Sequence, residues 1–318
     1  MTTPASAGSE VLSIGRTLVD LYPTEDGPLE GVVLFEKAVG GSPTNVAIAA
    51  ARLGRRAGMI SRVGDDAFGR FARASLAAEG IEVGQVRVVA GGTTPIAIPE
   101  ISPPDRFPLA FYRPEPPVDV AIDPGELDAE AVRAAGILWM SLTGFSAEPS
   151  RAAHRRVAEL RAGAGPTVLD LDYRPAFWAS RDEASDAARA ALAGVDILIG
   201  NREECAIVTG ERTVDGVIDA LLAAGARIVV VKLGEDGVVA ATRGERVTVA
   251  PIPVEVVNGL GAGDAFGGAF CHGLLSGWEL EQTVRFANAA GALVASRRGC
   301  STALPTADDV AALLAARG

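Results

Sequence analysis

Hydrophobic residues along this chain form two alternating patterns: short β-branched runs and longer alanine-rich segments of helical period. Short apolar runs bounded by turn residues are typical of buried strands, expected here at 10–15, 57–64, 136–142, 166–172, 196–200 and 227–234. Helices are expected at 42–54, 65–80, 149–162, 181–193, 213–224, 279–296 and 306–317. This alternation predicts an α/β fold, a doubly wound and mostly parallel sheet with helices on both faces.

One predicted helix has clear signals at both ends, in GSPTNVAIAAARLG. Ser42 is expected to cap it, Pro43 to occupy its first position and Gly54 to end it. The boundaries of this helix can therefore be predicted from local chemistry alone.

Two segments, residues 16–38 and 92–121, interrupt the alternation because they are proline-rich, β-like and without helical period. We expect them to form a small β-sheet lid beside the main sheet; a pair of long loops is the alternative. Long insertions in a compact domain are usually functional. With no repeat or low-complexity linker in view, residues 1–318 are expected to form one domain.

The charge balance argues against several classes of partner. Acidic residues outnumber basic ones by 40 to 29, a formal net charge of −11, whereas nucleic acids and anionic membranes are bound by basic patches. Three widely spaced cysteines (Cys205, Cys271, Cys300) indicate a reducing compartment rather than a disulfide scaffold or zinc site. No secretory leader or membrane-spanning stretch is recognisable, so a cytoplasmic protein is expected.

Polar residues gather directly after the predicted strands. Ligands of parallel sheets bind beyond the carboxyl ends of the strands, because these ends meet at one edge. The residues expected at this edge are Asp20, Asp170, Asp172, Arg174, Asn201, Glu204 and Lys232. Their coincidence predicts a binding site there.

The stretch NGLGAGDAF, residues 258–266, has few side chains. Gly261, Ala262 and Gly263 would let consecutive backbone N–H groups face an anion, and the small-residue helix that follows would add its positive end. Asp264 would repel that anion, but it could accept a proton from a hydroxyl that attacks a phosphate. A role as helix N-cap is the alternative, and the two are compatible.

Two other glycine motifs are excluded. A P-loop requires GxxxxGK[ST], and neither Lys37 nor Lys232 has those neighbours. A dinucleotide-binding GxGxxG turn would follow the first strand, and Asp264 stands where its last glycine belongs. Neither a Walker-type nucleotidase nor a nicotinamide oxidoreductase is therefore expected.

Three motifs together resemble the ribokinase or PfkB family of sugar kinases. VGGSPTNVAIAAARLG (39–54) is similar to the family's N-terminal signature, GLGAGDAFGGAF (259–270) to its C-terminal signature, and Asn201 to Glu204 to its N-x-x-E element. The resemblance extends through nearly the whole chain. It implies a ribokinase-like fold with a small β lid, ATP and Mg²⁺ as cofactors, and phosphorylation of a sugar hydroxyl.

The resemblance also implies roles for individual residues. The general base would be Asp264, and the anion hole would be formed by Gly261, Ala262 and Gly263. Sugar hydroxyls would be held by Asp20, Gly41 and Asn45. Mg²⁺ and phosphates would be organised, mainly through water, by Asn201 and Glu204. The nucleotide would be bound by Lys232, Gly234, Gly237 and Asn288.

Three of these residues also have structural explanations. Asn45 could be a buried helix side chain, Glu204 a first-turn acid favoured by the helix dipole, and Lys232 a solvated charge. One departure from the family concerns a monovalent cation, because the family often has Asp-Thr where this chain has Asn258 and Gly259. Activation by K⁺ therefore stays open.

Within the family, LDLDYRPAFW, GNREE, RRGCSTALPT and FYRPEPPVD are most similar to the bacterial 5-dehydro-2-deoxygluconokinases of inositol catabolism. Such kinases phosphorylate the terminal hydroxyl of a keto sugar acid, giving the 6-phosphate and ADP. An acid substrate needs a cation, and the planar fork of arginine fits a carboxylate. We expect Arg113 in the lid and Arg174 on the rim to bind it, with Arg16 a third candidate.

Other functions stay open at this point. 2-Keto-3-deoxygluconate is also a deoxy keto acid, whereas ribose and fructose would give Arg113 and Arg174 no carboxylate to meet. A protein that binds sugar or nucleotide without turnover is a different class, against which the intact GAGD turn argues. By resemblance only, a homodimer through the lid is expected.

Overall fold

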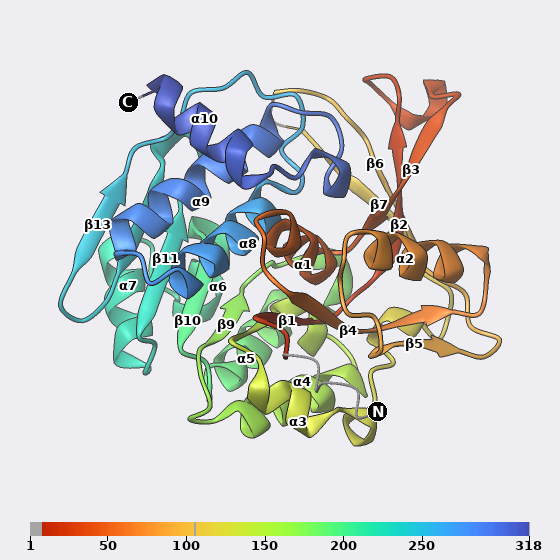
Figure 1. The fold of residues 1–318 in the computed structure, drawn as a ribbon, viewed down its shortest axis with the longest axis horizontal. Coiled ribbons are helices and arrows are strands. Elements are labelled where there is room, and N and C mark those ends of the chain that lie inside the picture. Colours follow the sequence, from red (N-terminus) through yellow and green to blue (C-terminus); the bar gives the residue numbers. More distant parts are fainter. Residues whose placement is uncertain (1–7, 105, 318) are drawn as a thin grey trace, which may run out of the picture.

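The computed structural model describes residues 8–104 and 106–317; of the expected single domain over 1–318, residues 1–7, 105 and 318 lie outside the described residues. Its centre is a nine-stranded sheet (Figure 1). The strand order is β13 (Arg246–Val249), β12 (Val238–Ala241), β11 (Ile228–Lys232), β10 (Ile197–Asn201), β9 (Thr167–Asp170), β8 (Ile137–Ser141), β1 (Val11–Ile14), β4 (Ala57–Gly64) and β5 (Val86–Val89). Neighbours from β11 to β5 are parallel, and the β12–β13 hairpin is added antiparallel.

Helices cover both faces of this sheet because its strands present apolar side chains on both. On β8, Trp139 faces one core and Met140 faces the other. The first core lies beneath α1 (Ser42–Arg52), α2 (Ala67–Ala78), α8 (Ala262–Leu275), α9 (Leu280–Ala295) and α10 (Ala307–Arg317). The second lies beneath α3 (Ala129–Ala134), α4 (Ser150–Arg161), α5 (Arg181–Ala191), α6 (Arg202–Thr209) and α7 (Val214–Ala223). The predicted doubly wound α/β class is confirmed.

A smaller sheet stands to one side of the central one (Figure 1). Its order is β3 (Phe35–Gly40), β2 (Leu18–Pro23), β6 (Ile96–Pro99) and β7 (Leu109–Tyr112). Strand β2 pairs antiparallel with β3 and parallel with β6. These strands come from the two segments that interrupt the strand–helix alternation. Within the described ranges, no helix is long and apolar enough to cross a bilayer.

The first turn of α1 differs from its prediction. Gly41 is the N-cap rather than Ser42, the helix begins at Ser42, and Pro43 is its second residue. At Gly41 the φ of 105° favours glycine, and a Cβ would lie only 2.3 Å from the carbonyl oxygen of Arg16. The prediction for Ser42 was wrong because this close approach fixes the helix start one residue earlier.

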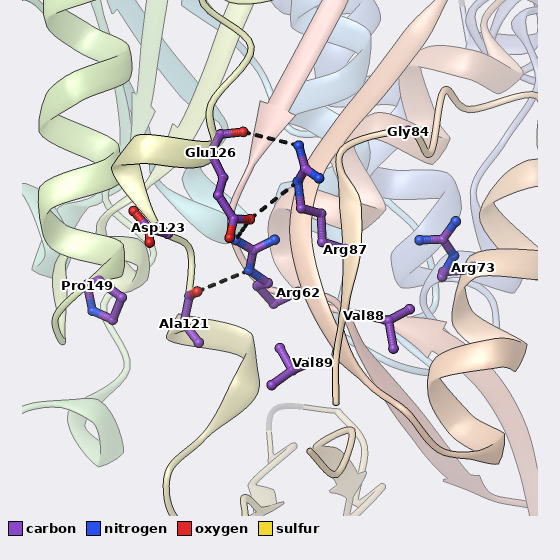
Figure 2. Close-up of a pocket in the computed structure, with 10 residues that line it drawn as sticks. All are labelled: Arg62, Arg73, Gly84, Arg87, Val88, Val89, Ala121, Asp123, Glu126 and Pro149. Carbon is purple, nitrogen blue, oxygen red and sulfur yellow. Dashed lines mark hydrogen bonds and ion pairs between the residues drawn. The ribbon is translucent and has the colours of Figure 1, made fainter. Parts of the chain in front are cut away.

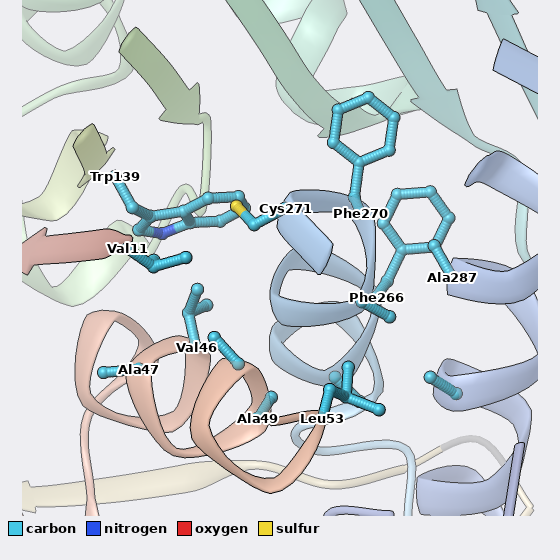
Figure 3. Packing of buried hydrophobic residues seen from close by; sticks show 14 of the residues in the cluster. Val11, Val46, Ala47, Ala49, Leu53, Trp139, Phe266, Phe270, Cys271 and Ala287 are labelled. Carbon is cyan, nitrogen blue, oxygen red and sulfur yellow. The ribbon is translucent and has the colours of Figure 1, made fainter. Parts of the chain in front are cut away.

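Glycines inside α8 permit two close contacts. A Cβ at Gly267 would lie 2.4 Å from the Trp139 ring, and a Cβ at Gly268 would lie 2.4 Å from the Ala49 Cβ of α1. Figure 3 shows Trp139 and Cys271 side by side, with α1 packed alongside. The absence of side chains thus brings α8 close to both the sheet and α1.

Gly268→Ala is expected to destabilise the protein although alanine is the better helix former by about 1 kcal/mol. The added methyl group would overlap Ala49 and approach the backbone nitrogen of Ala50 to 2.9 Å. Such overpacking costs roughly 1–3 kcal/mol, measurable by urea unfolding. Gly216→Ala in α7, where the Cβ meets only side-chain atoms of Glu211 and Thr213, is the control. Equal effects of the two substitutions would contradict the account.

Candidate active site

A cavity is lined by residues of the small sheet, the loops that follow β1 and β9, α1 and the start of α8. Residues of the small sheet, among them Leu109 and Phe111, contribute part of its lining. Six predicted site residues line it, namely Asp20, Gly41, Asn45, Arg174, Gly261 and Asp264. Segments distant in sequence therefore meet around one opening.

Asp264 lies in the first turn of α8 and is held by α1. Its Oδ2 accepts a hydrogen bond from Asn45 Nδ2 at 2.8 Å. Burial, reinforced by the charge of Asp172, raises the pKa of Asp264 to about 6. The carboxylate is thus ionised at neutral pH and able to take up a proton.

Asp20 is a second carboxylate in the same cavity. It lies against the backbone of β3, where a Cβ at Gly40 would be 2.3 Å from the Asp20 Cγ. Burial and the charge of Asp264 raise the pKa of Asp20 to about 7, while Arg16 opposes the shift. Hydroxyl groups that donate to Asp20 would stabilise its ionised form.

A cation stands beside the glycine turn that precedes α8. Gly261 has a φ of 84°, and a Cβ at Gly263 would lie 3.2 Å from the Nζ of Lys232. Lys232 ends β11, and its Nζ lies 3.6 Å from Asp170 Oδ1. Burial opposes the charge of Lys232, but Asp170 and Glu204 outweigh it and raise its pKa. The backbone N–H groups of this turn therefore lie next to the charged amine of Lys232.

Asn201 and Glu204 form a capping box at the start of α6. Asn201 Oδ1 accepts from the Glu204 N–H at 2.9 Å, and Glu204 Oε2 accepts from the Asn201 N–H at 2.7 Å. In the described part of the chain, no three His, Cys, Asp or Glu side chains gather as a metal site. Mg²⁺ fits such a place because in kinases it keeps waters and binds one or two carboxylates plus phosphates.

The predicted nucleotide residues lie outside the cavity. Gly234 and Gly237 have positive φ in the turn between β11 and β12. A Cβ at Gly237 would lie 2.2 Å from the carbonyl oxygen of Val249, and Asn288 Nδ2 of α9 donates to the carbonyl of Ala250 at 3.0 Å. Gly237 and Asn288 therefore both contact the chain at the end of β13, at Val249 and Ala250.

The two predicted carboxylate-binding arginines are placed differently. Arg174 lines the cavity, and its Nη2 lies 2.9 Å from Asp172 Oδ1. Arg113 does not line it; its Nη2 donates to the fully buried Asp119 Oδ1 at 2.9 Å. Both guanidinium groups have a carboxylate partner within the protein.

Cys300 is a site residue that sequence reasoning missed. Its Sγ accepts from Asn45 Nδ2 at 3.0 Å and lies 3.8 Å from Asp264 Oδ2. Burial and the charges of Asp264 and Asp20 raise the pKa of the thiol, which stays protonated. Its position, in an irregular turn remote in sequence from α1, offers no signal by which it could have been found.

A shallower depression of ≈ 650 Å³ near the β5 edge contains other charges (Figure 2). Glu126 there pairs with Arg62 and with Arg87, and Arg62 also donates to the carbonyl of Ala121 at 3.1 Å. None of the predicted site residues lines it. Because these charges satisfy each other, the cavity around Asp264 is the candidate active site.

Known proteins match this chain along most of its length. Residues 9–307 match the family described as pfkB family carbohydrate kinase. A 5-dehydro-2-deoxygluconokinase of Shouchella clausii (strain KSM-K16) is 36% identical, with 96% of this chain and 95% of the relative covered.

Solved structures agree with this match. The PfkB protein of Polaromonas sp. JS666 is 29% identical with a TM-score of 0.83, covering 92% of this chain and 98% of that chain. A fructokinase with bound ATP from Xylella fastidiosa, at 24% identity, shares the fold with a TM-score of 0.86, covering 97% and 99%. The resemblance inferred from the three motifs is confirmed: this chain belongs to the pfkB family of carbohydrate kinases, phosphotransferases that act on an alcohol group.

Proposed function

We propose that this kinase transfers the γ-phosphoryl group of ATP to the terminal hydroxyl of 5-dehydro-2-deoxy-D-gluconate, giving the 6-phosphate and ADP. The observation that carries this proposal is the Asp264 carboxylate, held by Asn45 beside a glycine turn and Lys232. The name of the Shouchella relative supports the choice of substrate.

Asp264 acts as the general base in this proposal. The substrate hydroxyl gives its proton to Asp264 as its oxygen attacks the γ-phosphorus. The new O–P bond forms while the bond from phosphorus to the bridging oxygen of ADP breaks, with no covalent enzyme intermediate. A pKa of about 6 suits a base that must be ionised near neutral pH and still accept a proton.

The backbone of Gly261, Ala262 and Gly263 forms the anion hole, and Lys232 adds a positive charge beside it. When bound, Mg²⁺ supplies charge neutralisation between the phosphates. Asn201 and Glu204 would hold that ion mainly through water. Nucleotide contacts are assigned to Lys232, Gly234, Gly237 and Asn288.

Sugar hydroxyls are assigned to Asp20, Gly41 and Asn45, and the acid end of the substrate to Arg174 and Arg113. Arg174 lines the cavity, and the Cζ of Arg113 lies 4.6 Å from the ring centre of Phe177. The second candidate is 2-keto-3-deoxygluconate, because the same cations favour any small keto acid. Neutral sugars such as ribose or fructose, and binding without turnover, are the further alternatives.

We propose that the whole chain is one kinase domain, that the small sheet closes over the cavity, and that two copies associate through it. Large apolar side chains are exposed on this sheet and its β2–β3 loop, namely Val33, Leu34, Phe35 and Tyr112. Sedimentation equilibrium at micromolar concentration tests the association. A monomer throughout, unchanged by Leu34→Glu, would rule it out.

Two further properties are proposed. Activity does not require K⁺, because the Asn258 amide is buried and bonded to the Gly299 carbonyl at 2.9 Å, where the family often has an acid. Replacing K⁺ by Na⁺ should leave the rate unchanged.

The enzyme works in the cytoplasm, since Cys205, Cys271 and Cys300 are free thiols. Recovery of the enzyme from a secreted fraction would contradict this.

Asp264→Asn should abolish turnover while leaving substrate binding, because asparagine keeps the shape but cannot accept the proton. Loss of general-base catalysis costs roughly 10²–10⁴-fold in kcat. Steady-state ADP release and calorimetric binding of the sugar acid measure the two effects. A variant with wild-type kcat would show that another group is the base.

The pH dependence of activity and of stability should have opposite signs. kcat/KM is expected to fall as the pH drops through about 6, where Asp264 becomes protonated. In the folded protein the pKa of Asp264 lies above the ordinary aspartate value of about 3.9. Between these two values the folded state binds more protons than the unfolded state, so stability falls as the pH rises through this window.

Asp264→Asn should therefore raise Tm at pH 8, where the wild type holds a buried carboxylate, and have little effect at pH 4. Rate profiles with Mg²⁺ in excess and thermal melts at both pH values provide the measurements. A flat rate profile from pH 5 to 8, or a lower Tm of the variant at pH 8, would contradict the assignment.

A further inference from the structure

Arg16 is a buried cation, and two of its three donor nitrogens have no partner among the described residues. Only 4% of the residue is exposed, and neither Nε nor Nη1 makes a hydrogen bond. Burying a guanidinium without a counter-ion is costly, and buried charges in proteins are normally paired. An unpaired one in a binding cavity therefore points to a ligand that supplies the missing acceptors.

The backbone of Arg16 is held firmly in the loop between β1 and β2. Its carbonyl oxygen accepts from Thr44 Oγ1 at 3.0 Å and lies against Gly41. Its side chain lies over aromatic rings, with Cζ 4.3 Å from the centre of Phe177 and 5.7 Å from that of Phe111. These rings fix the guanidinium plane by stacking but cannot accept its in-plane N–H groups.

Carboxylates lie near Arg16, but none of them is bonded to it. Asp119 is bonded to Arg113 and Asp172 to Arg174, both at 2.9 Å, so two of the three arginines are neutralised. Arg16 bonds neither carboxylate, although both raise its pKa against the dominant effect of burial, which lowers it. The Asp20 carboxylate faces the same cavity without a bond to Arg16. Of the three arginines in this cluster, Arg16 is thus the one whose guanidinium is not bonded to a carboxylate.

Resting on the proposed function, we propose that Arg16 binds the carboxylate of the sugar acid and so selects acids over neutral sugars. It lines the same cavity as Asp264, whereas Arg113 does not. The planar fork of Arg16 offers paired donors of the kind that a carboxylate accepts. Arg174 shares the acid end in the cavity, and Arg113 contributes to it as a positioning residue, which holds Asp119 and contacts the same Phe177 ring as Arg16.

Arg16→Met tests this assignment against a structural role for Arg16. Methionine keeps an unbranched stem among the aromatic rings but has no charge. KM for 5-dehydro-2-deoxygluconate should rise roughly 10- to 100-fold, with a smaller change in kcat, as expected for a lost hydrogen bond to a charged group. KM for fructose, a neutral sugar, should not rise. Tm without substrate should stay the same or increase, because an unpaired buried charge has been removed.

Arg161→Met is the matched control. Arg161 is also fully buried, but it donates to the carbonyls of Arg133 at 2.9 Å and Gly136 at 2.8 Å, and none of these residues lines the cavity. Its replacement leaves buried carbonyls unsatisfied, so Tm should fall while both KM values stay unchanged. The two variants are therefore expected to show opposite patterns.

An unchanged KM for the acid in Arg16→Met, or a fall in Tm like that of Arg161→Met, would overturn the inference. If Arg16→Met does not fold, Arg16→Lys serves as the test. Lysine keeps the charge but lacks the planar fork of arginine, so an unchanged KM for the acid would again refute the inference. A wild-type enzyme that prefers fructose would refute the proposed function itself. A wild-type enzyme that prefers the acid while Arg16→Met keeps that preference refutes only the role of Arg16.

Discussion

The close packing of α1 against α8 is the constraint on which the rest of the site depends. Two helices encoded more than 200 residues apart meet where Gly268 faces Ala49, and this contact brings Asn45 within 2.8 Å of Asp264. Any side chain at Gly268 would push the helices apart and lengthen that hydrogen bond. The glycines of the C-terminal motif therefore serve packing within α8 as well as the backbone turn before it.

The cavity holds both buried carboxylates and a buried guanidinium without a bonded partner. At the α8 end, burial raises the pKa of Asp264 and Asp20 to about 6 and 7, which favours groups that exchange or donate protons. Of Arg16, Arg113 and Arg174, Arg16 alone lacks a bonded carboxylate. A substrate with a hydroxyl at one end and a carboxylate at the other would offer the first group to Asp264 and the second to Arg16.

Local patterns predicted the parts of the fold that depend on local chemistry. The run 57–64 coincides with β4, and the glycine turn and Asp264 stand at the start of α8 as expected. The short elements β5, β12, β13, α3 and α6 were not predicted, because pairing and packing rather than periodicity stabilise them. The sequence pattern does not show that Asp119 bonds Arg113 rather than Arg16, because these side chains meet only in the folded protein.

Steady-state ADP release measures the central claim most directly, with Mg·ATP and saturating amounts of 5-dehydro-2-deoxygluconate, 2-keto-3-deoxygluconate, ribose or fructose. We expect turnover of the first acid with the highest kcat/KM and much weaker use of both neutral sugars, because only an acid supplies the acceptors that Arg16 lacks. Equal or better turnover of ribose or fructose would keep the kinase and its base but contradict the arginine-rich region as the determinant of specificity.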